Sequence, residues 1–151
     1  MRRAAIMAAL TGVVLWCSTA RADPDAWMAP AAPAGTAESK LGEGFALVEK
    51  QDWSGAEAAF REAIRLRAAF PEAWNGLGHA LRQQKKYEES VKSYEEALRL
   101  RPDYPQALEY LGEAYVEMGK VDAAREILGR LRALDPGEAG ELAKAIDHAG
   151  K

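Results

Sequence analysis

The sequence has very few of the side chains from which most catalytic and metal sites are built. Its 151 residues include one cysteine, Cys17, and only two histidines, His79 and His148. A lone cysteine forms no intramolecular disulfide, and the sequence has neither a haem-attachment motif nor a paired-cysteine zinc motif. It also lacks H-E-x-x-H and a glycine-rich phosphate loop after a strand. We therefore expect no enzyme, no catalytic residue, no bound metal and no cofactor.

The sequence also lacks an excess of positive charge. It contains 20 basic and 23 acidic residues, and its formal net charge is −3 at pH 7. Proteins that bind nucleic acid or anionic lipid rely on lysine and arginine to neutralise phosphate groups. We therefore expect a protein or peptide partner, and no nucleic acid.

Long apolar runs are missing as well, apart from a short one near the start. Two arginines precede residues 4–16, an apolar stretch that is too short to span a bilayer comfortably. The sequence Ala-Arg-Ala then ends at Ala22 with small residues on both sides of one position. This order is typical of a secretory signal peptide. We predict that residues 1–22 are cleaved after Ala22, that the protein is periplasmic or secreted, and that it has no stable membrane insertion afterwards.

Loss of that segment would leave a chain without cysteine, with 17 basic and 23 acidic residues and a formal charge of −6. Such a chain must hold its fold by packing alone. Residues 23–36 follow as a proline- and alanine-rich linker. Trp27 and Met28 are its only large apolar residues, and they predict either a mobile tail or a short docking motif.

The rest of the sequence is dominated by a pattern that returns every 34 residues. A fixed period of this size predicts stacked copies of one unit rather than a single closed core. Apolar residues at helical spacing predict two helices in each period, and no strand signal appears. Three positions illustrate the repeat, with their counterparts one period later: Trp74 and Leu108, Gly78 and Gly112, Pro102 and Pro136.

The predicted fold is all-α: a right-handed α-solenoid of three helix–turn–helix repeats with a C-terminal capping helix. Thr36 is a predicted helix cap, and Pro71 opens a later helix. Glu138 to His148 is the predicted capping segment, with a polar outer face. The predicted boundaries are 37–70, 71–104 and 105–138 for the repeats and 139–151 for the capping helix and tail.

Two glycines, Gly78 and Gly112, lie within predicted helices, where glycine costs about 1 kcal/mol relative to alanine. A sequence keeps glycine at such a helix position only where a larger side chain would not fit. We expect the second helix of each pair to approach closely there, with small side chains opposite: Ala56, Ala97 and Ala124.

These residues resemble the tetratricopeptide repeat (TPR), a 34-residue helix–turn–helix unit. The first copy is degenerate, because Lys40 and Glu43 replace the Trp and Leu of the pattern. The third copy carries Leu108 in the Trp position. The middle copy matches most closely, through Trp74, Leu77, Gly78, Leu81, Tyr87, Tyr94, Ala97 and Pro102.

The resemblance implies that the first helices line a concave groove that receives peptides. The implied groove grades from apolar, through polar and basic, to acidic. It predicts an extended or helical partner segment with apolar anchors at one end and a lysine or arginine near the other. The implied groove residues are Leu41, Phe45, Val48, Asn75, His79, Arg82, Glu109, Glu113 and Val116.

One subset of the family grips the C-terminal carboxylate of chaperones with Lys, Asn and Arg in the groove. In this sequence Leu41 and Phe45 stand where Lys and Asn would be, and Gln106 and Tyr110 replace the basic pair. Asn75 is displaced by one residue. We therefore expect no carboxylate clamp.

The sequence predicts a non-enzymatic adaptor or scaffold that binds a peptide or protein segment in the bacterial periplasm. One alternative is a self-assembling structural module of an envelope complex, a homo-oligomer, because the exposed ends of a short array could stack. A weaker alternative is a small-molecule or metal binder that uses His79, Glu109 and Glu113.

Overall fold

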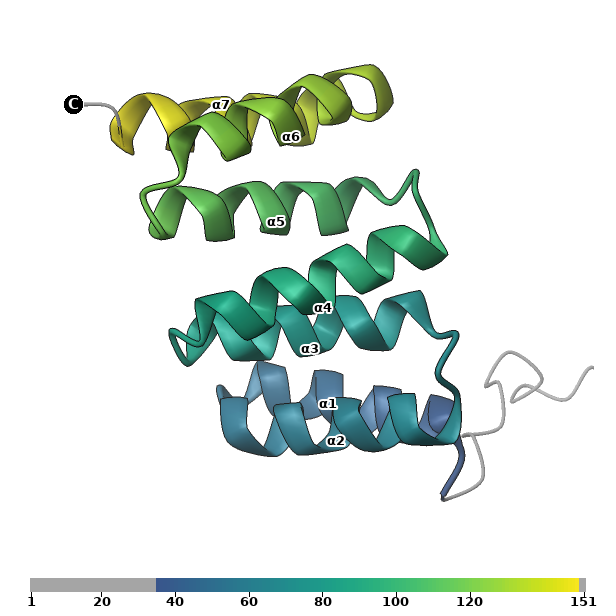
Figure 1. The fold of residues 1–151 in the computed structure, drawn as a ribbon. Coiled ribbons are helices and arrows are strands. Elements are labelled where there is room, and N and C mark those ends of the chain that lie inside the picture. The colour runs from purple at the N-terminus through teal and green to yellow at the C-terminus, as the bar shows by residue number, and fades with distance from the viewer. Residues whose placement is uncertain (1–34, 150–151) are drawn as a thin grey trace, which may run out of the picture. The chain divides into compact units, whose positions relative to one another are not determined.

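Seven helices follow one another along residues 35–149, the part of the chain that the computed structural model describes. Figure 1 shows them stacked in chain order. The predicted signal peptide and the Trp27–Met28 pair lie outside the described residues. Within 35–149, no helix has the length and apolar character needed to cross a membrane. The helices are α1 (Ala37–Glu49), α2 (Trp53–Leu66), α3 (Pro71–Gln83), α4 (Tyr87–Leu100), α5 (Pro105–Glu117), α6 (Val121–Leu134) and α7 (Pro136–Ala149).

Local signals in the sequence set where these helices begin. The Thr36 hydroxyl accepts a hydrogen bond from the Ser39 amide at 3.1 Å, which confirms the predicted cap. Pro71 and Pro105 occupy first-turn positions of α3 and α5, where a missing N–H costs nothing.

The turns inside the three pairs are copies of one another. Gln51, Lys85 and Gly119 lie 34 residues apart, and all three have a positive φ, of 59°, 61° and 72°. Each turn also carries a backbone hydrogen bond that spans five residues, as from the Lys86 amide to the Leu81 carbonyl at 3.0 Å. Only the third turn uses glycine, the residue for which this backbone conformation is free of strain.

The capping helix α7 begins at Pro136, before the Glu138 that the pattern predicted. The Asp135 carboxylate accepts hydrogen bonds from the amides of Gly137 and Glu138, at 2.8 and 3.1 Å. Asp135 therefore ends α6 and also caps α7, so the connection between them is a single residue.

The pattern of helix contacts makes one face of the array concave. The first helices touch across neighbouring pairs, α1 with α3 and α3 with α5. The backbones of the second helices α2, α4 and α6 lie farther apart, with no Cα atom of one within 8 Å of a Cα atom of another. A stack whose elements meet on one side and separate on the other is curved. We call the surface of α1, α3 and α5 the concave face.

The helix glycines accommodate large side chains rather than the alanines that the sequence suggested. A Cβ atom on Gly78 would lie 2.6 Å from the Tyr94 ring, and one on Gly44 would lie 2.5 Å from the Phe60 ring. At Gly112 the side chain that such a Cβ would meet is Leu142, from the capping helix. The predicted close approach is present, but it fits a ring or a leucine into the space where a Cβ would be.

Candidate functional site

A pocket of about 230 Å³ opens on the concave face, between α1, α3 and the start of α5. Aromatic and apolar side chains form much of its wall, and the lining includes no lysine or arginine. Its lining residues are Phe45, Val48, Asn75, Gly76, His79, Tyr104, Gln106 and Tyr110.

Two polar atoms of this lining are buried without a protein partner. The Asn75 side chain is only 6% exposed, and its Oδ1 accepts no hydrogen bond from the described residues. The same holds for Nδ1 of His79. Buried polar atoms in folded proteins are nearly always paired with protein, water or ligand. These two atoms are therefore exceptions among the buried polar groups of the described residues.

His79 is held between aromatic rings. Its ring centroid lies 5.8 Å from that of Trp53, in an edge-on arrangement, and 5.4 Å from that of Tyr110. Burial, together with the positive charge of Arg82, lowers the pKa of His79. The ring is therefore neutral at pH 7 and presents one nitrogen as an acceptor.

Arg82 does not supply the basic middle of the groove that the sequence predicted. Its side chain is 9% exposed, and it forms ion pairs with Glu113 at 2.7 Å and Glu117 at 2.9 Å. These carboxylates come from the next pair of helices, so Arg82 ties α3 to α5. Carboxylates of the same chain therefore neutralise the charge of Arg82. The middle of the concave face is aromatic and polar rather than basic.

Glu109 is the carboxylate on the acidic side of this face that no cation neutralises directly. Burial, with the negative charges of Glu138 and Glu113, raises the pKa of Glu109 to about 7. Arg82 opposes the shift, and Glu141 adds to it. The capping helix therefore helps to set the charge of the groove, because Glu138 and Glu141 belong to α7.

This pKa predicts a loss of stability as the pH rises. The folded protein keeps the Glu109 proton up to about pH 7, whereas an unfolded chain releases it near pH 4.3. The contribution of Glu109 to stability is therefore fully present below about pH 4 and is lost as the pH rises to about 7. Urea unfolding at about pH 5 and about pH 8 should show that Glu109→Gln removes part of this loss, about 1 kcal/mol after solvent screening.

The exposed Glu88 on α4 supplies the matched control. Glu88→Gln should leave the pH dependence of the wild-type protein intact. Equal behaviour of the two variants would show that Glu109 does not carry the raised pKa.

The nine predicted groove residues separate into three groups. Phe45, Val48, Asn75 and His79 line the pocket. Leu41 and Val116 pack against the hydrophobic core instead, and the charged residues Arg82, Glu109 and Glu113 lie outside the pocket lining, toward α5 and α7.

Sequence reasoning missed the aromatic wall of the pocket. Tyr104 and Gly76 were not predicted as groove residues, and Tyr110 was named only as the replacement of a basic clamp residue. Gly76 and Tyr110 lie 34 residues apart, so they occupy the same position of the repeat. Reading that position as groove-facing would have found both.

His79, Glu109 and Glu113, the residues of the alternative metal site, are not placed together as metal ligands. Among residues 35–149, no group of three histidine, cysteine, aspartate or glutamate side chains is placed to hold a metal ion. Glu113 is engaged by Arg82, and His79 is packed between Trp53 and Tyr110.

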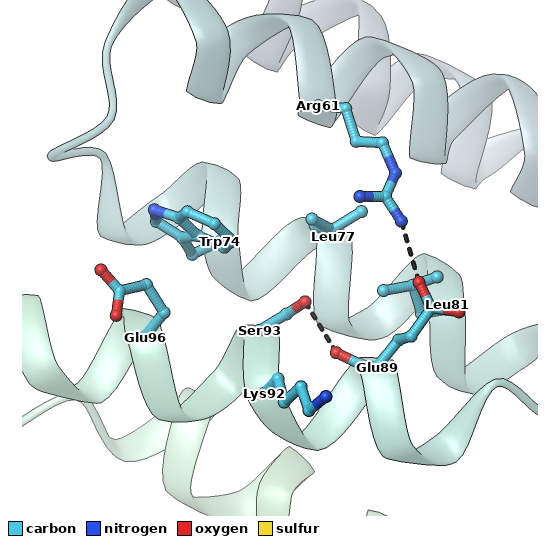
Figure 2. Close-up of a pocket in the computed structure, with 8 residues that line it drawn as sticks. All are labelled: Arg61, Trp74, Leu77, Leu81, Glu89, Lys92, Ser93 and Glu96. Carbon is cyan, nitrogen blue, oxygen red and sulfur yellow. Dashed lines mark hydrogen bonds and ion pairs between the residues drawn. The ribbon is translucent and has the colours of Figure 1, made fainter.

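A second hollow, of about 390 Å³, lies on the other side of the array between α2 and α4, above α3 (Figure 2). Leu77, Leu81 and Trp74 form its floor. Figure 2 shows Arg61 reaching across to Glu89, with which it pairs at 3.1 Å. The Ser93 hydroxyl donates to the Glu89 carbonyl at 2.9 Å.

The sequence explains why this hollow forms: its side chains are smaller than those at the equivalent positions one repeat later. One period later, the position of Ser93 is occupied by Ile127, which is buried in the core, and that of Leu81 by Tyr115. The first junction thus carries two smaller side chains. No lining atom of this hollow is buried without a partner, in contrast to the pocket on the concave face.

Comparison with known families finds two overlapping matches. A family described as "TPR repeat" matches residues 78–119, and one described as "Tetratricopeptide repeat" matches residues 106–137. No curated protein matches the chain.

Several solved structures share the fold. The TPR2B domain of yeast Sti1, in a pHsp70 complex, has a TM-score of 0.71 at 22% identity, covering 76% of this chain and 95% of that one. The second TPR domain of human RPAP3, in complex with the HSP70 peptide SGPTIEEVD, has a TM-score of 0.69 at 22% identity, covering 76% and 95%. The Arabidopsis OM64 TPR domain has a TM-score of 0.71 at 18% identity, covering 74% and 94%. At these identities the likeness shows the fold.

Proposed function

We propose that the chain is a non-enzymatic adaptor whose concave face binds a segment of a partner protein, because residues 78–119 and 106–137 match tetratricopeptide-repeat families and the fold is shared with TPR domains. One observation carries the proposal: a pocket of about 230 Å³ opens on that face, and aromatic, apolar and amide side chains line it. Phe45, which is 44% exposed, offers an apolar contact beside it.

The similar structures support a peptide as the partner, because the RPAP3 domain is in complex with an HSP70 peptide and the Sti1 domain is in a pHsp70 complex. They do not support the same peptide. The RPAP3 peptide ends in the acidic sequence EEVD, and carboxylates are bound most strongly by arginine and lysine side chains. Here the pocket lining includes no lysine or arginine. The nearby arginines Arg82 and Arg101 are paired within the fold, with Glu113 and Glu72.

The cellular setting that we propose is the bacterial periplasm, or the exterior. The support is the order of arginines, apolar stretch and Ala-Arg-Ala in residues 1–22. Mass spectrometry of the protein from the envelope fraction of the native cell should find an N-terminus at Asp23. An intact Met1 in the soluble cell interior would contradict this setting.

A random-peptide library selected on the folded protein tests the binding face. Phe45→Ala should weaken the selected peptides at least about tenfold, because it removes an exposed contact at the pocket. Leu134→Ala is the matched control, since Leu134 is 45% exposed at the end of α6, away from the pocket lining. Peptides that respond equally to both substitutions, or to neither, would rule out the concave face as the binding surface.

A further inference from the structure

Asn75 is the only asparagine in the sequence, and a glycine follows it. An asparagine side chain reacts with the backbone nitrogen of the next residue most readily when that residue is glycine, because glycine has no side chain to obstruct the approach. No glutamine and no aspartate precedes a glycine anywhere in the sequence. The Asn75–Gly76 pair is therefore the one position where the sequence favours this reaction.

The folded array holds this pair in a geometry that prevents the reaction. Asn75 and Gly76 lie in the interior of α3, where each amide N–H is bonded to the carbonyl four residues earlier. Both residues are buried, and the Gly76 backbone lies against the Phe60 ring. The Gly76 nitrogen can reach Cγ of Asn75 only if Asn75 leaves its helical backbone angles. The reaction therefore requires α3 to open.

We propose that Asn75–Gly76 is a deamidation site that the folded array protects and that unfolding of α3 exposes. In the open chain the Gly76 nitrogen attacks Cγ of Asn75 and loses its proton to water. The Cγ–Nδ2 bond breaks, and ammonia leaves with a proton taken from water. Water then opens the cyclic imide at either of its carbonyls. The product at position 75 is an aspartate or an isoaspartate, in which the main chain runs through the former side chain.

Neither product fits the place that Asn75 occupies. An aspartate would bring a negative charge to a position that is 6% exposed. Arg82 and Arg101, which lie over the two tyrosine rings of the pocket, are already paired with carboxylates, so they offer the new charge no free counter-charge. An isoaspartate would lengthen the backbone by a methylene carbon beside the contact between Gly76 and Phe60, and would interrupt the helical hydrogen bonds of α3. A chain that stays open long enough to react therefore loses the ability to rebuild the concave pocket.

Conversion rates in the denatured and the folded protein test the site. One sample is held in mildly alkaline guanidinium chloride, and the other in the same buffer without denaturant. Peptide mapping by mass spectrometry follows the change of amide to acid and locates it. The denatured sample should convert at Asn75, and the folded sample should convert at least about tenfold more slowly, because only its open fraction reacts. Equal rates in the two samples, or no conversion at Asn75 in the denatured one, would overturn the inference.

Refolding shows whether the conversion damages the fold. After dilution from denaturant, the fraction of chains that regain the helical circular dichroism of the starting protein should fall in step with the converted fraction. A sample stored in mildly acidic denaturant is the control, because the Gly76 nitrogen loses its proton less readily there, and it should stay unconverted and refold fully. Asn75→Gln is the matched variant. Its imide ring would have to be larger, so it should stay unconverted in alkaline denaturant, where its own folding is not needed. Full recovery by converted chains, or conversion of this variant at the rate of the wild type, would contradict the inference.

Discussion

Phe60→Ala is expected to lower the free energy of unfolding by about 3–5 kcal/mol. The Phe60 ring has no exposed surface and is wedged between Gly44 of α1 and Gly76 of α3. Truncation leaves a cavity that both backbones line, and neither helix can close it without moving. Such a loss could equal most of the stability of a three-repeat array. Urea unfolding followed by circular dichroism measures it.

Two further variants show whether the wedge is the cause. Phe45→Ala removes the same side chain at a 44% exposed position and should cost below about 1 kcal/mol. Gly76→Ala would place a Cβ 2.6 Å from the Phe60 ring, so it should destabilise the wild type although alanine favours helices. In the Phe60→Ala background the same change should become neutral or stabilising. A constant effect of Gly76→Ala in both backgrounds would contradict this packing.

Removal of both carboxylates that face Arg82 should have the second largest effect. Glu113→Gln with Glu117→Gln leaves a 9% exposed guanidinium without a counter-charge. We expect a loss of about 3 kcal/mol, at the low end for a buried pair because the carboxylates themselves are partly exposed. Urea unfolding of the double variant provides the measurement.

A triple variant, which adds Arg82→Met to that double variant, tests whether the unpaired charge of Arg82 causes the loss of stability. An apolar side chain of similar length removes the stranded charge and should restore most of the lost stability. Asp122→Asn serves as the control, because the Asp122–Arg125 pair is exposed and should be worth less than about 1 kcal/mol. If the triple variant is no more stable than the double variant, then the buried charge is not the source of the loss.

The 34-residue period was sufficient to predict the helix pairs, because local signals repeat with it. Thr36 caps α1 as expected, and the turn at Lys85 has its counterpart at Gln51. These features depend on a few neighbouring residues, so they can be derived from the sequence. The start of α7 was placed too late, because the double role of Asp135 in ending one helix and capping the next was not recognised.

The charge of the concave face could not be derived in the same way. Arg82 pairs with Glu113 and Glu117, which are 31 and 35 residues away, and that contact depends on how neighbouring pairs of helices meet. The raised pKa of Glu109 depends on Glu138 from the capping helix. A gradient drawn from residue types alone therefore counted Arg82 as free positive charge and overlooked the aromatic wall that includes Tyr110.

Amide hydrogen exchange, with and without a library-selected peptide, tests the central claim most directly. Binding at the concave face should slow exchange in α1, α3 and α5, around Phe45, His79 and Tyr110. The faces of α2 and α4 that border Ser93 and Arg61 should exchange as before. Protection centred on that second hollow, with the concave face unchanged, would contradict the account.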